Sequence, residues 1–168
     1  IGEAVARIFR REGERNSVIG GKEIRLSCDV LEASLISGIT SMGTDVIKIG
    51  VVPTAVVPFS ISYYKVNAAI MITASHNPAS DNGFKFFNGN GFRISDEQES
   101  HIEHLISNSS DYALFPFDKL GRVHFSRASL NAYINMVKSE LKFKKKFKIL
   151  FDCANGSSSS VVKKIFKG

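Results

Sequence analysis

Three side chains that could take part in chemistry follow a short apolar run near the middle of the chain. Ser75 and His76 come soon after the run 68–72, and Lys85 lies ten residues beyond Ser75. The apolar run predicts a buried strand, so the serine and histidine would lie on the loop at its carboxyl end. Ligands of open α/β sheets bind at this edge. The sequence therefore predicts a reactive site on the loop 73–78.

Ser75 could act as a nucleophile, carry a phosphoryl group, or form only a turn hydrogen bond. In an extended chain adjacent side chains point to opposite sides, which makes His76 a poor base for Ser75. The Gly-x-Ser-x-Gly pattern of many hydrolases is also absent. A loop serine can carry a phosphoryl group that backbone amides, a cation and a metal ion stabilise. Phosphoryl transfer therefore fits these residues better than hydrolysis.

Each polar neighbour of Ser75 has a structural and a functional interpretation. Strand alternation places Lys85 opposite two phenylalanines, where it is either solvated or reaches a phosphoryl group as charge stabiliser or acid/base. His76 is either structural or in contact with the phosphoserine. Arg25, which we expect on the first strand, forms an exposed ion pair or orders the serine loop. Asn77 is expected to form a turn.

The elements before the serine loop alternate between strand and helix. We predict strands at 18–28, 45–52 and 68–73, and helices at 3–12, 29–42 and 53–64, with Asp29 as an N-cap. This order predicts an α/β fold, with a mixed, mainly parallel sheet and helices on both faces.

After the loop the pattern predicts an antiparallel hairpin and then a second strand–helix start. We predict strands at 83–87, 92–94, 122–125 and 149–151, a loop at 108–121, and helices at 96–107, 127–141 and from about 159. Ser95 and Gln98 form a capping-box pattern for the first of these helices. We place a domain boundary near residue 126, with one domain at 1–125 and the beginning of a similar one at 126–168.

Composition narrows the class of protein. The 168 residues are 43% hydrophobic with mean hydropathy near zero, and no apolar run approaches the roughly 18 residues that span a membrane. The net charge of +6 suits a small anionic substrate and also suits a loosely basic surface. We expect the basic run 142–148 to be a solvated link, since no nucleic-acid recognition motif accompanies it. Cys28 and Cys153 are expected to be buried thiols in a reducing cytoplasm.

The serine loop resembles that of the α-D-phosphohexomutase superfamily. The similarity comprises the loop 73–78, the segment 81–85 after it and the turn 152–156, which is similar to the first turn of the superfamily's second domain. Three other stretches, 21–27, 38–43 and 86–97, are most similar to the bacterial branch that acts on glucosamine phosphates. Glu23, Ile24 and Ala55 depart from the usual residues. The chain begins at Ile1 and ends at Gly168, and we expect a fragment of a longer protein.

The resemblance implies a phosphosugar substrate and a phosphorylated Ser75. Ser75 would donate its phosphoryl group to glucosamine 6-phosphate, and the resulting bisphosphate would return its other phosphoryl group and leave glucosamine 1-phosphate. The resemblance also implies that Mg²⁺ would bind the Ser75 phosphate and an aspartate-rich loop of the second domain, outside this chain; within the chain the four histidines are scattered and predict no metal site. Lys85 would assist proton transfer, His76 would contact the phosphoryl group, and Arg25 and Asn77 would order the loop or substrate.

Alternatives are a mutase of the same superfamily acting on mannose or glucose phosphates, and a non-catalytic α/β binding module with the basic link as its binding feature. By itself the fragment is expected to be inactive, because the metal, sugar and phosphate-binding parts would lie outside it. No sequence feature indicates an oligomeric state.

Overall fold

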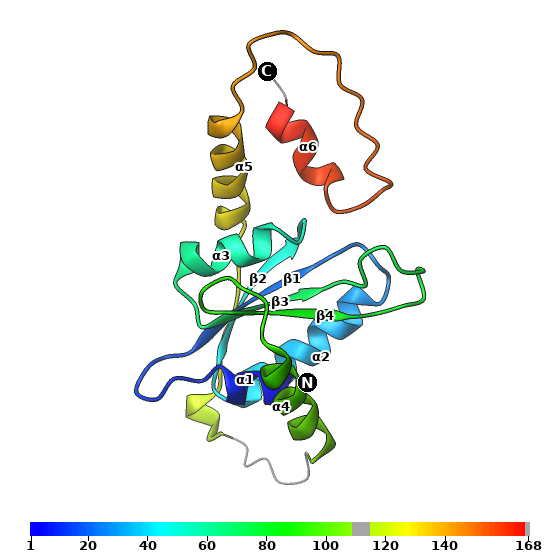
Figure 1. Ribbon diagram of the computed structural model, residues 1–168. Helices are drawn as coiled ribbons and strands as arrows, with labels where there is room; N and C mark the ends of the chain where they lie inside the picture. The colour runs from blue at the N-terminus through cyan, green and yellow to red at the C-terminus, as the bar shows by residue number, and fades with distance from the viewer. Residues whose placement is uncertain (109–114, 167–168) are drawn as a thin grey trace.

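The computed structural model describes residues 1–108 and 115–166, and within them one five-stranded sheet forms the centre of the fold (Figure 1). The strands are β1 (Ser17–Lys22), β2 (Asp45–Val51), β3 (Ala68–Ile72), β4 (Phe84–Asn88) and β5 (Val123–Phe125). Their order is β4-β3-β1-β2-β5, and only β4 runs antiparallel to its neighbour. The predicted mixed, mainly parallel sheet is confirmed.

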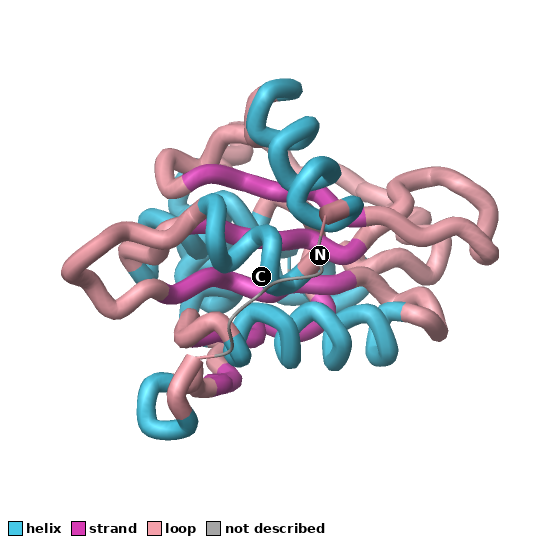
Figure 2. The backbone as a smooth tube through the Cα atoms, turned by 90° about the horizontal axis from the view of Figure 1, so that it is seen from below, coloured by secondary structure: helices cyan, strands magenta, loops and turns pink. Residues whose placement is uncertain are grey.

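Helices cover both faces of this sheet, as predicted. One side carries α1 (Gly2–Ile8), α2 (Cys28–Ser41) and α4 (Asp96–Ser107), which Figure 2 shows in front of the strands. The other side carries α3 (Val56–Tyr64) and α5 (Ala128–Glu140), with α6 (Ser159–Phe166) beside α5. A short 3₁₀ helix spans Phe117–Lys119. No helix in the described residues is long and apolar enough to cross a membrane.

Strand β3 is buried on both faces, which fixes the base of the serine loop. Ile70 and Ile72 enter the core beneath α1, α2 and α4, whereas Ala69 and Met71 enter the core beneath α3 and α5. All four side chains are at most 2% exposed. Each large apolar side chain buried in this way contributes about 1.5–3 kcal/mol. The loop therefore starts from one of the most firmly packed parts of the sheet.

Hydroxyl contacts join α5 to α3. The hydroxyl of Ser60 donates to that of Ser129 at 2.8 Å, and the Tyr64 hydroxyl donates to Ser126 Oγ at 2.7 Å. Leu130 and Ile134 of α5 pack into the same core as α3. Packing thus continues across residue 126, while the division into domains at 1–125 and 126–168 stays a prediction.

The predicted continuation of the first strand through 24–28 is wrong. Strand β1 ends at Lys22, one further ladder hydrogen bond runs from Glu23 N to Ile72 O, and the chain then leaves the sheet. Helix α2 begins at Cys28, where Cys28 N donates to Arg25 O. Arg25 therefore lies on a loop rather than a strand, because its carbonyl accepts from Cys28 N at the start of α2 instead of from a neighbouring strand.

Other departures have similar physical causes. The predicted strand 149–151 is irregular chain whose residues are mostly exposed, since no strand in the described residues pairs with it. The return strand 92–94 is reduced to one bridge between Phe87 and Arg93, and α1 ends at Ile8 instead of residue 12. Of the predicted loop 108–121, residues 109–114 lie outside the described residues. Both cysteines are free; Cys28 is buried and Cys153 half-buried.

Candidate active site

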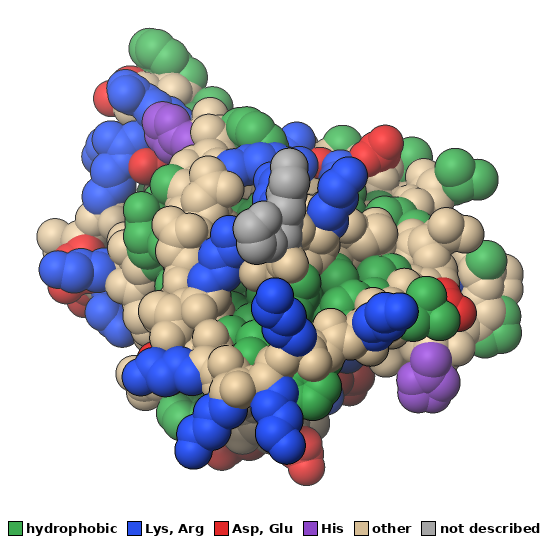
Figure 3. All heavy atoms as spheres, turned by 90° about the horizontal axis from the view of Figure 1, so that it is seen from above, with side chains coloured by type: hydrophobic (Ala, Val, Ile, Leu, Met, Phe, Trp, Pro, Cys, Tyr) green, Lys and Arg blue, Asp and Glu red, His purple; other side chains and the backbone are tan. Residues whose placement is uncertain are grey.

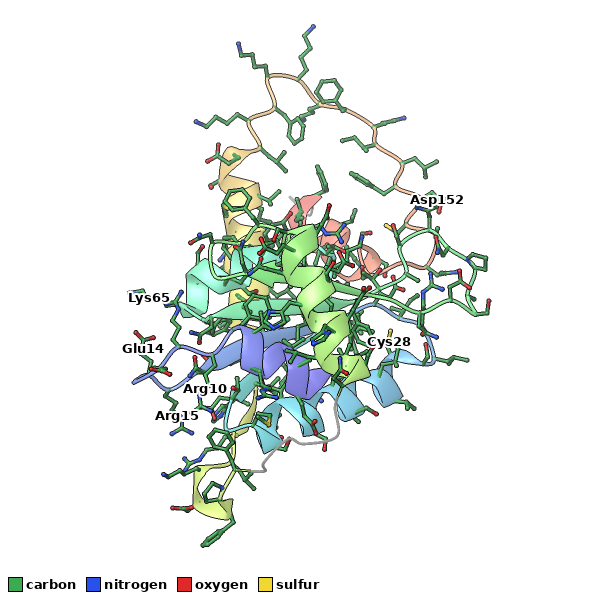
Figure 4. The ribbon with its side chains drawn as sticks, turned by 60° about the horizontal axis from the view of Figure 1, so that its bottom comes forward. Arg10, Glu14, Arg15, Cys28, Lys65 and Asp152 are labelled. Atoms are coloured by element: carbon green, nitrogen blue, oxygen red, sulfur yellow. The ribbon has the colours of Figure 1, made fainter. Side chains whose placement is uncertain are left out.

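The serine loop leaves the carboxyl end of β3 and closes back on the start of β4. Thr73 N donates to Gly83 O at 2.9 Å. A Cβ on Gly83 would lie 2.8 Å from Thr73 O, so this closure leaves no room for a side chain. Turns at Ala74–Asn77 and Pro78–Asp81 shape the chain between these points. The end of β1 lies beside this loop, at the end of the sheet where Figure 4 labels Cys28, opposite Lys65.

Ser75 adopts a left-handed backbone conformation, with φ at +56°. For a residue other than glycine this conformation costs about 1–2 kcal/mol, and here the Ser75 N–H donates to Thr73 Oγ1 at 2.9 Å. The loop is therefore not extended, and the predicted opposition of the serine and histidine side chains is wrong. Ser75 Oγ and His76 Nδ1 lie 3.4 Å apart, both exposed, which is a long and weak contact.

No hydrolase triad surrounds this pair in residues 1–108 and 115–166. The contact recorded for the His76 ring is the one with Ser75 Oγ, and no carboxylate orients the ring there. A nucleophile–base pair of this type needs a shorter hydrogen bond and a third group that orients the base. The geometry fits an exposed hydroxyl that receives and donates a group better than it fits hydrolysis.

Arg25 binds the main chain of the serine loop at four points. Nη1 donates to Pro78 O and, at 3.1 Å, to Asp81 O; Nη2 donates to Ser75 O at 3.3 Å and to Asn77 O at 2.9 Å. The Arg25 side chain is only 12% exposed. These contacts are those that a loop-ordering residue needs, and their effect on activity stays a prediction.

Glu23 is a site residue that the sequence reasoning did not assign. Its carboxylate accepts hydrogen bonds from Arg25 Nε, Thr73 Oγ1 and Ala74 N. Burial raises the pKa of Glu23, but the hydrogen bonds from Arg25, Thr73 and Ala74, with the charge of Arg25, outweigh it and lower the pKa. Glu23 is therefore ionised at neutral pH. The available signal was its Glu-x-Arg spacing to Arg25 at the end of a strand.

Lys22, the residue before Glu23, ties the end of β1 to helix α2. Lys22 Nζ lies 2.5 Å from Asp29 Oδ1 and 2.6 Å from Glu32 Oε2, and Lys48 Nζ lies 3.1 Å from Glu32 Oε2. Burial lowers the pKa of Lys22, and the hydrogen bonds to Asp29 and Glu32 more than offset this and raise it. A buried carboxylate with two lysine partners thus fixes the end of β1.

Lys85 lies on β4 opposite Met71 of β3. Phe84 and Phe86 pack into the core on the α2 side, whereas Phe87 packs into the core on the α3 side. The predicted alternation along this strand is therefore confirmed. Lys85 itself is half-buried.

The surface has two hollows, one beside the serine loop and one near α6. One of about 470 Å³ lies between the loop after β1 and the serine loop, and it is lined by Ile24, Arg25, Leu26, Ser27, Ala79, Ser80 and Asn82. A larger one of about 860 Å³ lies between segment 143–151 and α6, among lysines and phenylalanines. The first is lined by Arg25, whose guanidinium binds the Ser75 carbonyl, and it is therefore the better candidate for a substrate.

The expected magnesium site, with the Ser75 phosphate and further ligands outside this chain, stays a prediction. Among the described residues, no group of three histidine, cysteine, aspartate or glutamate side chains could hold a metal ion. Magnesium prefers several oxygen ligands in octahedral geometry, and Ser75 would supply only phosphate oxygens.

The fold and the serine loop, together with comparison to known proteins, define the family to which this chain belongs. A family model described as phosphoglucomutase/phosphomannomutase, alpha/beta/alpha domain I, matches residues 1–113. The chain belongs to this phosphohexomutase family.

Two curated relatives and one solved structure show which members of this family the chain is similar to. The chain is 37% identical over 98% of its length to the phosphoglucosamine mutase of Desulforamulus reducens, and 40% identical over 99% to that of Syntrophus aciditrophicus. A solved phosphoglucomutase/phosphomannomutase family structure from Burkholderia thailandensis matches 99% of the chain with a TM-score of 0.84 and 25% identity, and 36% of that structure is covered. The chain spans 38% of the length of both curated relatives.

Proposed function

We propose that the protein containing this chain interconverts glucosamine 6-phosphate and glucosamine 1-phosphate, with Ser75 as the phosphoryl carrier. The observation that carries the proposal is the geometry of Ser75, an exposed hydroxyl on a loop whose carbonyls Arg25 binds at four points. Such preorganisation suits transfer of a charged group in a fixed direction. The relatives named phosphoglucosamine mutase support the choice of sugar.

The reaction consists of two phosphoryl transfers. In the first, the bond between Ser75 Oγ and phosphorus breaks, phosphorus bonds to the O1 oxygen of glucosamine 6-phosphate, the O1 hydroxyl loses its proton, and Ser75 Oγ gains one. In the second, the 6-phosphoryl group of the bisphosphate moves to Ser75 Oγ, and O6 gains the proton that Ser75 loses. The enzyme is thereby phosphorylated again, and the product is glucosamine 1-phosphate.

The other site residues have supporting roles in this proposal. Lys85 assists the proton transfers and His76 contacts the phosphoryl group from its position beside Ser75 Oγ. Arg25 and Asn77 hold the loop. Magnesium would neutralise phosphate charge when bound, with its remaining ligands outside this chain.

The sugar assignment is tested with the full-length protein and the 6-phosphates of glucosamine, mannose and glucose. We expect kcat/KM for glucosamine 6-phosphate to exceed the other two by at least about tenfold, because a site that binds an amine leaves its polar groups unpaired with a hydroxyl analogue. Faster turnover of the mannose or glucose ester would overturn the sugar assignment. The 168-residue chain alone is expected to give no turnover in the same assay.

A further inference from the structure

Both backbone groups of Ser75 are connected to one carboxylate. The Ser75 N–H donates to Thr73 Oγ1 at 2.9 Å, and the Thr73 hydroxyl donates to Glu23 Oε2 at 2.8 Å. The Ser75 carbonyl accepts from Arg25 Nη2 at 3.3 Å, and Arg25 Nε donates to Glu23 Oε1. Glu23 thus binds the Thr73 hydroxyl and the Arg25 guanidinium, which in turn bind the Ser75 backbone.

The direction of these hydrogen bonds depends on the charge of Glu23. A hydroxyl has one proton, and Thr73 can give it to Glu23 only because a carboxylate accepts and does not donate. The lone pairs of Thr73 Oγ1 are then available to the Ser75 N–H. Hydrogen bonds to an ionised acceptor are roughly twice as strong as neutral ones. The series of hydrogen bonds from the Ser75 amide through the Thr73 hydroxyl to the Glu23 carboxylate therefore runs in one direction.

The left-handed conformation of Ser75 requires such support. A non-glycine residue at φ +56° is strained, and the surrounding structure must hold it there. Glu23 is itself well fixed, because its side chain is 16% exposed, its N–H bonds Ile72 O, and Lys22 before it is paired with Asp29 and Glu32. The support of Ser75 thus begins in the sheet and in α2.

We propose that Glu23 is a positioning residue that sets the direction of the Ser75 hydroxyl through Thr73 and Arg25. This inference rests on the proposed phosphoryl-carrier role of Ser75. Glu23 is not required to touch the sugar, so its loss slows the transfer step and leaves substrate binding largely intact.

The test uses the full-length protein with the variants Glu23→Gln, Thr73→Val and the double variant. Glutamine keeps the shape of Glu23 but presents one acceptor oxygen and an NH₂ donor, so it cannot accept from all three donors. We expect kcat to fall about 10–100-fold in each single variant, with KM within about twofold. The double variant should be no slower than the slower single variant, because both changes break one connected unit.

Two controls accompany these variants. Glu97→Gln makes the same chemical change at an exposed residue of α4 and should leave kcat unchanged. Thr73→Ser keeps a hydroxyl and should recover most of the kcat that Thr73→Val loses. Glu23→Gln with kcat within twofold of wild type, a KM increase without loss of kcat, or losses that multiply in the double variant would each overturn the proposal.

A crystal structure of the Glu23→Gln protein separates this inference from the proposed function. We expect Ser75 to leave the positive-φ region in Glu23→Gln and to keep it in Glu97→Gln. This readout does not depend on turnover. A wild-type protein that never carries phosphate on Ser75 would end the phosphoryl-carrier proposal, whereas an unchanged Ser75 φ in Glu23→Gln would end the positioning proposal.

Discussion

Arg25 uses three nitrogen atoms of one guanidinium to hold two loops together. Nη1 and Nη2 bind carbonyls of the serine loop, while Nε binds Glu23 on the loop after β1. A guanidinium presents five donors in a fixed plane, whereas the lysine ammonium is a single point with three. Arginine is therefore required here by geometry and not by charge alone.

The variant Arg25→Lys tests this requirement. A lysine cannot reach four carbonyls and a carboxylate at once, so we expect kcat of the full-length protein to fall by about 100-fold or more. The melting temperature should change by only a few degrees, because the contacts lie outside both apolar cores. Steady-state kinetics and thermal unfolding measure these effects. Arg93→Lys, at an exposed position, is the control, and wild-type activity in Arg25→Lys would disprove the geometric requirement.

At this scale the sequence predicts which elements carry the candidate residues but not how these residues bind one another. The strand that ends at Ile72 and the loop after it predict the positions of Ser75, His76 and Lys85. The positive φ of Ser75 has no local signature, since serine carries none of glycine's freedom. Glu23 and Thr73 are 50 residues apart in the chain, and only the pairing of β1 with β3 brings them together.

Asp45 joins three elements at the opposite end of the sheet. It begins β2, binds Arg15 through Nε at 2.6 Å and Nη2 at 3.1 Å, and accepts from the Arg122 N–H at 2.7 Å. These contacts tie the loop before β1, which Figure 4 marks at Glu14 and Arg15, to the start of β5. The Asp45 side chain is 12% exposed and that of Arg15 is 61% exposed, so removal of Asp45 would leave a half-buried hydrogen-bond site at Arg122 N–H and a solvated Arg15 without this acceptor.

We expect stability to depend on Asp45 and on pH. Burial raises the pKa of Asp45, but Arg15, the Arg122 N–H and the charge of His124 outweigh it and lower the pKa. A carboxyl with a lowered folded pKa stabilises the fold fully above its unfolded value of about 3.9, and this stabilisation is lost as pH falls through the folded value.

Urea unfolding of the 168-residue chain with Asp45→Asn measures this contribution. At pH 7 we expect the variant to be less stable by about 1 kcal/mol, because the exposed Arg15 is screened by solvent and asparagine keeps one acceptor oxygen. The difference should shrink as pH falls below about 4. Asp118→Asn, at an exposed residue, is the control. A difference that stays constant from pH 7 to the acid range would contradict the ionic origin of the effect.

The elements with local signals are those that the sequence predicts best. Helix α4 has the predicted bounds and the predicted capping box of Ser95 and Gln98. The segments 24–28 and 149–151 have apolar residues typical of strands, yet a strand requires a partner for its backbone groups. Leu26 is 99% exposed and Leu150 is 95% exposed, which shows that apolar character alone did not place them in the sheet.

The described residues comprise a tightly packed part, the sheet with its two cores, and a more open part, segment 143–151 with α6. The sheet with its two cores holds the serine loop, whereas segment 143–151 and α6 enclose an apolar hollow and expose several phenylalanines. Lys and Arg side chains gather on the face seen in Figure 3, from the top of Figure 1, where this segment lies. Ser75 thus lies on a loop of the packed part, and its proposed role as phosphoryl carrier stays to be tested.

The phosphorylation state of Ser75 tests this view most directly. The full-length protein is incubated with glucosamine 1,6-bisphosphate, and its intact mass and phosphopeptides are measured beside those of Ser75→Ala. We predict one phosphoryl group on the wild-type peptide that contains Ser75, none on the variant, and loss of the variant's turnover. Phosphate at another residue, or unchanged turnover in Ser75→Ala, would contradict the role of Ser75 as phosphoryl carrier.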